Sequence, residues 1–189
     1  METFRELQPN LPAPIDDGAC DRLLGTSVPD MTLPSTSGER ISLRQRTRHA
    51  SVLYFYPRTG VPGQQLPDGW DLIPGARGCT PQACGFRDHA AELEDLGAQV
   101  LGISAQPTDE QREFAERIGL PFSLLSDPAL LLAEQMGLPT FEVGSMRLFK
   151  RVTLIAKGAK IVKVFYPIFP PDRNAGDVVA WLKTNEMSR

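Results

Sequence analysis

The chain has 189 residues, of which 41% are hydrophobic, and this size and composition fit one compact domain with a sizeable core. Its 20 basic and 23 acidic residues give a formal net charge of -3, which argues against binding to nucleic acid or to an anionic membrane surface. Residues 1–14 carry scattered charges, and no window approaches the about 18 apolar residues of a membrane span, so we expect a cytoplasmic protein.

The N-terminal part of the chain predicts an extension, a hairpin and a buried strand. Residues 1–27 are rich in Pro, Asp and Gly and form the predicted extension, and the domain proper runs over 28–189. Residues 31–33 and 41–43 alternate apolar and polar positions around a Gly-containing turn, which predicts a β-hairpin. The apolar run 51–56 then predicts a strand that is buried on both faces.

A long segment without a regular pattern follows this strand. Pro57 ends the strand, and residues 59–77 carry many Gly and Pro residues and a lone Trp70, with no sustained period. We therefore expect a loop. Loops of this length inside a compact domain tend to be functional or mobile.

The rest of the chain alternates between predicted helices and strands. Thr80 and Pro81 are typical of an N-cap and a first helical residue, and the apolar stripe that follows predicts one helix ending at Gly97. The remaining predicted elements are strands at 99–103, 122–125, 152–155 and 161–165, a helix from the capping box Thr108–Gln111 to Gly119, a helix from Ser126 to Met136, and a closing helix over 174–183. Together they specify an α/β fold with a mixed central sheet flanked by helices.

Cys79 is the candidate reactive thiol, because it lies just before the predicted N-cap of the helix that follows the long loop. Unpaired backbone N–H groups and the positive end of the helix dipole favour a thiolate there. Arg77 adds a positive charge only if it points at the sulfur, and a loop arginine is more often solvated. The alternative is that Cys79 is a small buried hydrophobe.

Cys84 follows five positions after Cys79. In an intact helix its side chain points roughly 140° away, and the Cα separation exceeds the about 7 Å limit for a disulfide. The pair can therefore close only if the start of the helix unwinds, after which the Cys84 thiol can attack an oxidised Cys79. Ordinary packing of Cys84 on the helix is an equal alternative.

Other chemistries find little support in the sequence. Three cysteines are too few for a disulfide framework, and Cys79, Cys84 and His89 match none of the usual zinc spacings. We expect His89 and His49 at the surface. There is no Cys-x-x-Cys, phosphate loop, Ser-His-Asp set or pair of carboxylates that stands out, so no cofactor and no metal are expected.

Two segments carry a resemblance to a known family. Val52-Leu-Tyr-Phe-Tyr-Pro57, followed by Gly78-Cys-Thr-Pro-Gln-Ala-Cys84-Gly-Phe-Arg-Asp88, resembles the peroxiredoxins, specifically the peroxiredoxin Q or bacterioferritin comigratory protein branch. Both cysteines, the threonine after the first and the Arg-Asp pair match in order. The similarity in the order of elements extends from about Val28 to Lys183.

The resemblance implies a thioredoxin-like fold and a function. Cys79 would be the peroxidatic cysteine and Cys84 the resolving cysteine of the same chain. Arg151 would hydrogen-bond both the thiolate and the peroxide, because a guanidinium group stays charged and holds several N–H donors in a fixed geometry. Pro57 would shield the thiolate. The substrate would be hydrogen peroxide or an organic hydroperoxide, and a thioredoxin-like or glutaredoxin-like reductant would recycle a monomeric or homodimeric enzyme.

The chain departs from the family pattern between Pro57 and Cys79. An insertion of roughly fifteen residues lies there, and the position three before Cys79, where the family has threonine, is Ala76. Either Thr59 or Thr80 supplies the missing hydroxyl, with Thr59 favoured, or the backbone amides and Arg151 act without it. The insertion is a lid around Trp70, a partner-binding segment or a tolerated surface loop.

Two rival functions remain at this level. A non-enzymatic redox sensor or protein-binding module would react slowly with peroxide, and a thiol-disulfide reductase would reduce disulfides without peroxide. Cys20, in the extension, is expected to be a bystander, with a resolving role as the alternative if Cys84 is inert. The segments 143–148 and 165–169, together with the insertion, are candidate contact surfaces, although such apolar segments are as often core.

Overall fold

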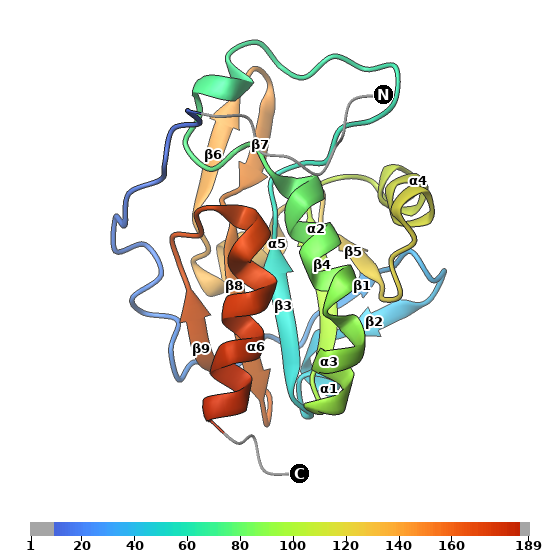
Figure 1. The fold of residues 1–189 in the computed structure, drawn as a ribbon, viewed down its shortest axis with the longest axis vertical. Coiled ribbons are helices and arrows are strands. Elements are labelled where there is room, and N and C mark those ends of the chain that lie inside the picture. Colours follow the sequence, from blue (N-terminus) through green and yellow to red (C-terminus); the bar gives the residue numbers. More distant parts are fainter. Residues whose placement is uncertain (1–9, 186–189) are drawn as a thin grey trace.

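The computed structural model describes residues 10–185, and its centre is a mixed five-stranded sheet (Figure 1). The strand order is β5-β4-β3-β8-β9. β4 runs parallel to β3 and β5, whereas β8 runs antiparallel to β3 and β9. The strands are β3 (Ser51–Phe55), β4 (Gln99–Ser104), β5 (Leu124–Ser126), β8 (Val152–Lys157) and β9 (Lys160–Phe165). The predicted mixed sheet is thereby confirmed.

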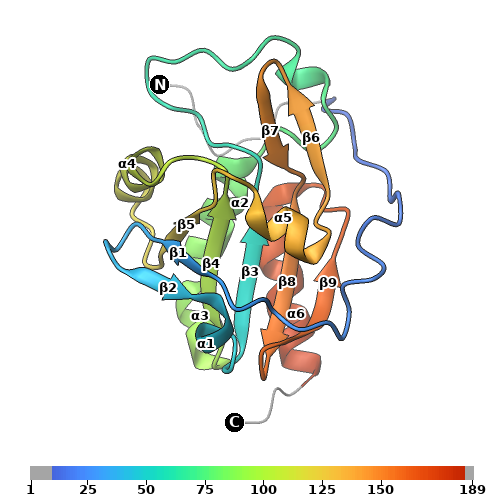
Figure 2. The same ribbon diagram turned by 180° about the vertical axis from the view of Figure 1, so that it is seen from behind.

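Both faces of the sheet are covered, and the central strand β3 is buried along its whole length. Val52 and Tyr54 belong to the core on one face, and Leu53 and Phe55 belong to the core on the other. Helices α2 (Cys79–Asp88), α3 (Ala90–Asp95) and α6 (Asn174–Thr184) cover the first face, with α4 (Thr108–Ile118) beside them (Figure 1). The hairpin β1 (Thr32–Pro34) and β2 (Arg40–Ser42), with α1 (Leu43–Arg46) and α5 (Leu131–Met136), lies on the second face (Figure 2).

Gly102 lets the large ring of Tyr54 lie against the neighbouring strand. The two residues are register partners in the parallel pair of β3 and β4. A Cβ atom at Gly102 would come within 2.5 Å of the Tyr54 ring and of a Leu124 methyl group. Any other residue here would displace the ring that packs beneath α2 and stacks on Phe86 at a centroid distance of 4.6 Å.

The described part of the N-terminal extension is packed onto the domain. Gly25 and Thr26 exchange backbone hydrogen bonds with Ile161 of β9, at 2.8 and 2.9 Å. Cys20 and Leu23 are buried in the core on the second face of the sheet. The extension thus covers the edge of β9, which would otherwise expose unpaired backbone groups.

The helix that carries Cys79 starts earlier than predicted and is interrupted. Gly78, with φ of 99°, is the N-cap, so Cys79 is the first residue of α2 and Thr80 is not the cap. A glycine adopts this left-handed conformation without strain and redirects the chain into the helix. His89 ends α2 and precedes α3, so the single helix predicted up to Gly97 is wrong.

Two other predicted helix starts need correction. α5 begins at Leu131 rather than near Ser126, because the buried carboxylate of Asp127 accepts hydrogen bonds from the N–H groups of Leu131 and Leu132, at 3.0 and 2.9 Å. Thr108 is the first residue of α4, but the side chain of Pro107, the N-cap, makes no capping hydrogen bond. None of the helices within residues 10–185 is long and apolar enough to cross a membrane.

One hairpin was not predicted, and it supports the insertion. β6 (Thr140–Val143) and β7 (Met146–Phe149) pair in an antiparallel manner. The insertion contains a short 3-10 helix, η1 (Trp70–Leu72), and Trp70 is only 3% exposed because it packs with Val143 and Leu148. A second 3-10 helix, η2 (Pro171–Arg173), leads into α6. The insertion is therefore anchored by a small core of its own.

Candidate active site

Cys79 lies at the N-terminus of α2, above the end of β3. Its side chain is 4% exposed and belongs to the core that contains Tyr54, Tyr56 and Phe86. The thiol lies 3.7 Å from the carbonyl oxygen of Ala76, which is the only hydrogen-bond acceptor within range among the described residues. Its position at the positive end of a ten-residue helix favours negative charge on the sulfur.

Arg151 is the cationic group beside this sulfur. Its side chain is 4% exposed, and its Nη2 atom lies 3.3 Å from Cys79 Sγ. Nη2 also donates to the carbonyl oxygens of Gly75 and Arg77, at 3.2 and 3.0 Å. The arginine precedes β8, and the carbonyl groups come from the end of the insertion. Arg151 therefore joins the insertion to the thiol.

The guanidinium group has one unused donor. Arg151 Nε is buried and has no hydrogen-bond partner. A buried donor without a partner costs stability, so its presence in a folded protein calls for a functional explanation. Among residues 10–185, Arg151 pairs with no carboxylate, so a Cys79 thiolate would be its nearest counter-ion.

Gln82 holds the other end of the guanidinium group. The side chain of Gln82 is fully buried, and its Oε1 atom accepts a short hydrogen bond from Arg151 Nη1. Its Nε2 atom donates to Asn174 Oδ1 at 3.0 Å. Because Gln82 lies one helical turn after Cys79, α2 supplies both the thiol and a residue that aims the arginine at it.

Cys84 lies on the same helix and remains a free thiol. It is 7% exposed, and Cys79 and Cys84 form no disulfide. The intact helix over Cys79–Asp88 is the arrangement in which the two side chains point apart. The packing is tight just beyond Cys84, since a Cβ atom at Gly85 would lie 3.2 Å from the carbonyl oxygen of Asp172.

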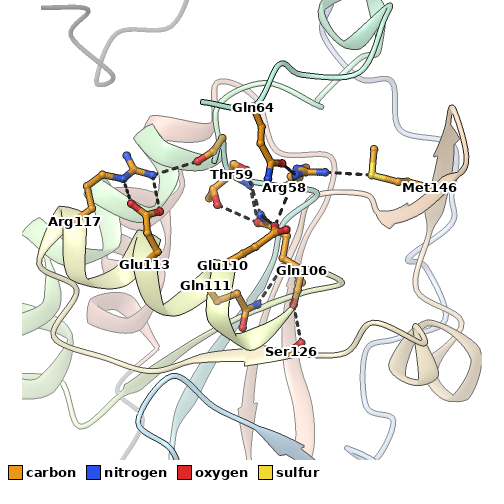
Figure 3. Close-up of polar contacts among 12 residues, drawn as sticks. Arg58, Thr59, Gln64, Gln106, Glu110, Gln111, Glu113, Arg117, Ser126 and Met146 are labelled. Carbon is orange, nitrogen blue, oxygen red and sulfur yellow. Dashed lines mark hydrogen bonds and ion pairs between the residues drawn. The ribbon is translucent and has the colours of Figure 1, made fainter. Parts of the chain in front are cut away.

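The start of the insertion is fixed to α4 and to the loop that precedes it (Figure 3). The backbone N–H and the hydroxyl of Thr59 both donate to Gln106 Oε1, at 2.8 and 3.0 Å, and Gln106 Nε2 donates back to the Thr59 carbonyl at 3.2 Å. Arg58 forms an ion pair with Glu110 at 3.7 Å and contacts Met146 of β7. Arg117 Nη2 donates to the carbonyl of Gly60 at 3.2 Å.

The hydroxyl of Thr59 therefore has a partner other than the sulfur that the sequence suggested. Pro57 is buried at the end of β3, and Thr80 is half-buried in the first turn of α2. Arg77 forms an ion pair with Asp71 of the insertion, which lowers the pKa of that carboxyl group. Arg77, which is close to Cys79 in the sequence, thus pairs with a carboxylate of the insertion. Arg151, which is distant in the sequence, contacts the Cys79 sulfur.

Comparison with known proteins places the chain in a family. The redoxin profile matches residues 23–179. A putative peroxiredoxin bcp of Coxiella burnetii is 31% identical over 162 residues, which cover 84% of this chain and 97% of that protein. This chain belongs to the redoxin family, in its peroxiredoxin Q/bcp branch. Peroxiredoxin Q, chloroplastic, of Arabidopsis thaliana is 29% identical over 159 residues, and the match spans 66% of that longer protein.

Solved structures agree with this placement. The crystal structure of peroxidoxin BcpB from Mycobacterium tuberculosis has a TM-score of 0.70 and 31% identity, covering 85% of this redoxin and 96% of that chain. A PrxQ mutant from Xylella fastidiosa has a TM-score of 0.69 and 21% identity, covering 86% of this chain and 96% of that chain. The thioredoxin-like fold predicted for the redoxin domain is confirmed.

Several residues of the redoxin site were missed from the sequence. Gln82 stands four positions before Phe86, on the apolar stripe of the predicted helix, and a polar residue there signals a buried hydrogen-bond partner. Asn174 carries no such signal, because an asparagine near a helix start is expected as a cap. Gln106 follows a strand in a loop, where a glutamine is ordinarily solvated.

The other polar residues near the thiol do not provide a base or a metal site. Burial raises the pKa of the Tyr54 and Tyr56 hydroxyls, so both stay neutral. His89 lies near the surface in contact with Glu92. Within residues 10–185, no group of three or more His, Cys, Asp or Glu side chains is arranged to hold a metal ion.

Proposed function

We propose that this redoxin is a thiol-dependent peroxidase that reduces hydrogen peroxide or an organic hydroperoxide with Cys79. The observation that carries the proposal is Arg151, which lies 3.3 Å from Cys79 Sγ and keeps a buried Nε donor without a partner. One guanidinium group can then stabilise the attacking thiolate and the peroxide oxygens together. The bcp relative of Coxiella burnetii, which carries the name peroxiredoxin, supports the same activity.

The first step oxidises the sulfur. The Cys79 thiolate attacks the terminal oxygen of ROOH, an S–O bond forms, and the O–O bond breaks. The leaving RO⁻ takes up a proton and departs as alcohol or water, and Cys79 becomes a sulfenic acid. Arg151 stabilises the charge that moves from sulfur to the leaving oxygen, and Pro57, buried at the end of β3, is the proposed shield against bulk water.

The second step uses Cys84 as the resolving residue. The start of α2 unwinds, and the Cys84 thiolate attacks the Cys79 sulfenic sulfur, forming an S–S bond and releasing hydroxide, which is protonated to water. A thioredoxin-like or glutaredoxin-like dithiol then reduces this disulfide by exchange. No metal or cofactor takes part. Thr59 holds the segment after Pro57 in place through Gln106.

Intact-mass measurement after brief exposure to stoichiometric hydrogen peroxide tests the proposal. The reduced parent should lose two hydrogens as one internal disulfide. Cys84→Ser should stop at sulfenic or higher acids, and Cys79→Ser should not react. Cys20→Ser is the matched control and should behave as the parent does. A parent that reacts no faster than free cysteine would leave a redox sensor or binding module in place of the peroxidase.

A further inference from the structure

Four buried polar side chains form a chain that leads from the thiol to α6. Arg151 contacts Cys79, Gln82 contacts Arg151, Asn174 contacts Gln82, and Thr153 contacts Asn174. All four side chains are at most 4% exposed. Gln82 lies on α2 and Asn174 on α6, two helices that pack against each other, whereas Arg151 immediately precedes β8 and Thr153 lies in that strand (Figure 1).

The chemistry of these groups fixes the direction of every hydrogen bond. A guanidinium group can only donate, so Gln82 must present its oxygen to Arg151. The amide nitrogen of Gln82 then needs an acceptor, which is Asn174 Oδ1 at 3.0 Å. Thr153 Oγ1 donates to the same oxygen at 2.7 Å. Two donors therefore keep the oxygen of Asn174 turned toward Gln82.

This arrangement has a cost that packing does not explain. With its oxygen turned inward, the Nδ2 atom of Asn174 is buried and has no hydrogen-bond partner. A buried amide nitrogen without a partner is destabilising, and Asn174 carries this penalty while its oxygen accepts from both Gln82 and Thr153. The asparagine is thus better explained by the orientation that it imposes on Gln82 than by the space that it fills.

We propose that Asn174 and Thr153 are positioning residues that orient the amide of Gln82 and thereby hold Arg151 against the Cys79 sulfur. The inference rests on the proposed peroxidase function and extends its site to α6. Neither residue touches the sulfur or the substrate. Gln82 with its amide reversed would present N–H groups to Arg151, and the two donors would repel each other and displace the guanidinium group.

The first test replaces one buried threonine hydroxyl at a time. Thr153→Val removes the donor that holds Asn174, with little change in shape. Thr47→Val is the matched control, because Thr47 is equally buried but its hydroxyl donates to the carbonyl of Leu43, at 2.8 Å, away from the site. Two rates are measured for each variant: alkylation of Cys79 by iodoacetamide as a function of pH, resolved by peptide mass, and oxidation by hydrogen peroxide.

For Thr153→Val, we expect the midpoint of the Cys79 alkylation profile to move to higher pH and the peroxide rate constant to fall about threefold, the equivalent of one modest hydrogen bond. Thr47→Val should change neither. If the two variants have the same alkylation profile as the parent, or if both shift it equally, the positioning role is overturned.

A second test uses the symmetry of a carboxylate, whose two oxygen atoms both accept hydrogen bonds, so that turning the group over changes nothing. In the parent, Asn174→Leu should lower the peroxide rate constant about tenfold and shift the alkylation midpoint upward. In a Gln82→Glu background, both oxygens at position 82 can accept from Arg151, so the added Asn174→Leu should change either quantity less than twofold. An equal loss in both backgrounds would mean that Asn174 acts only through the stability of the fold.

The alkylation profile also separates this inference from the function on which it rests. Iodoacetamide reports the thiolate whether or not peroxide is the substrate. A parent that does not react with peroxide, but whose alkylation midpoint shifts in Thr153→Val and not in Thr47→Val, would refute the peroxidase function and keep the positioning role. A peroxidase whose midpoint is unchanged in both variants would refute the positioning role alone.

Discussion

Cys79 and Cys20 are both buried thiols, at 4% and 5% exposure, but their surroundings are opposite in charge. Burial, followed by the carboxylates of Asp17, Asp16 and Asp21, raises the pKa of Cys20 to about 12. Cys79 instead lies at a helix N-terminus with the guanidinium group of Arg151 at 3.3 Å. Since the two side chains are about equally exposed, the feature that differs between the two thiols is the sign of the neighbouring charge.

The largest expected effect comes from weakening the charge arrangement at Cys79. Arg151→Lys keeps a cation but loses the fork that reaches the sulfur, the carbonyl groups and Gln82 at once, so the rate constant of Cys79 with hydrogen peroxide should fall by about 100-fold. Rapid-quench mass spectrometry measures it. Arg147→Lys, at an exposed arginine of β7, is the control and should react as the parent does. A normal rate in Arg151→Lys would remove Arg151 from the mechanism.

A change in packing alone should lower the stability of the fold and leave Cys79 more reactive than Cys20. Trp70→Ala removes the ring that anchors the insertion, and we expect a loss of about 3 kcal/mol in the free energy of unfolding by denaturant titration. Leu72→Ala, in the same 3-10 helix but 81% exposed, should change it by less than about 0.5 kcal/mol. Equal effects of the two variants would contradict the anchoring role of Trp70.

The smallest expected effect concerns Asp17, one of the carboxylates near Cys20. Hydrogen bonds from Lys150 and Tyr166 lower the pKa of Asp17 to about 2. Because this pKa is below that of an unfolded carboxyl group, the stabilisation is present above about pH 4 and is lost as the pH falls from about 4 to about 2.

Asp17→Asn should therefore lower the melting temperature by less than about 3 °C at neutral pH, because the group is exposed, and the difference should vanish near pH 2. It should also make Cys20 somewhat easier to alkylate, since one of the carboxylates that raise its pKa is gone. Differential scanning fluorimetry across pH measures the first effect. A difference that grew toward low pH would contradict the sign of this linkage.

The sheet and the location of Cys79 near a helix start were predictable from local signals. The apolar run at Ser51–Phe55 indicates the strand by its composition, and the apolar stripe after the long loop indicates the helix by its period, although α2 begins at Cys79 and not after Thr80. The break at His89 and the hairpin of β6 and β7 were not predicted, because tertiary contacts with neighbouring segments determine them. The sequence predicted a loop for the insertion. In the structure, Trp70 packs against the hairpin of β6 and β7, about seventy residues later in the sequence, and so gives the insertion a small core.

The polar partners of the site were harder to predict than its thiol. Arg151 was identified only through resemblance, since the strand position does not reveal what its side chain contacts. Thr59 was expected to face the sulfur, but the structure pairs its hydroxyl with Gln106. Asn174 and Gln82 meet across α6 and α2, a contact between residues 92 positions apart that no local pattern encodes.

The most direct test of the contrast between the two thiols is to measure peroxide oxidation of Cys79 and Cys20 separately in the same molecule at pH 7. Samples are quenched with an alkylating reagent under denaturing conditions and analysed by peptide mass. We predict that Cys79 is oxidised at least about 100-fold faster than Cys20. Comparable rates at the two cysteines would contradict the claim that Arg151 and the start of α2 make Cys79 the reactive thiol.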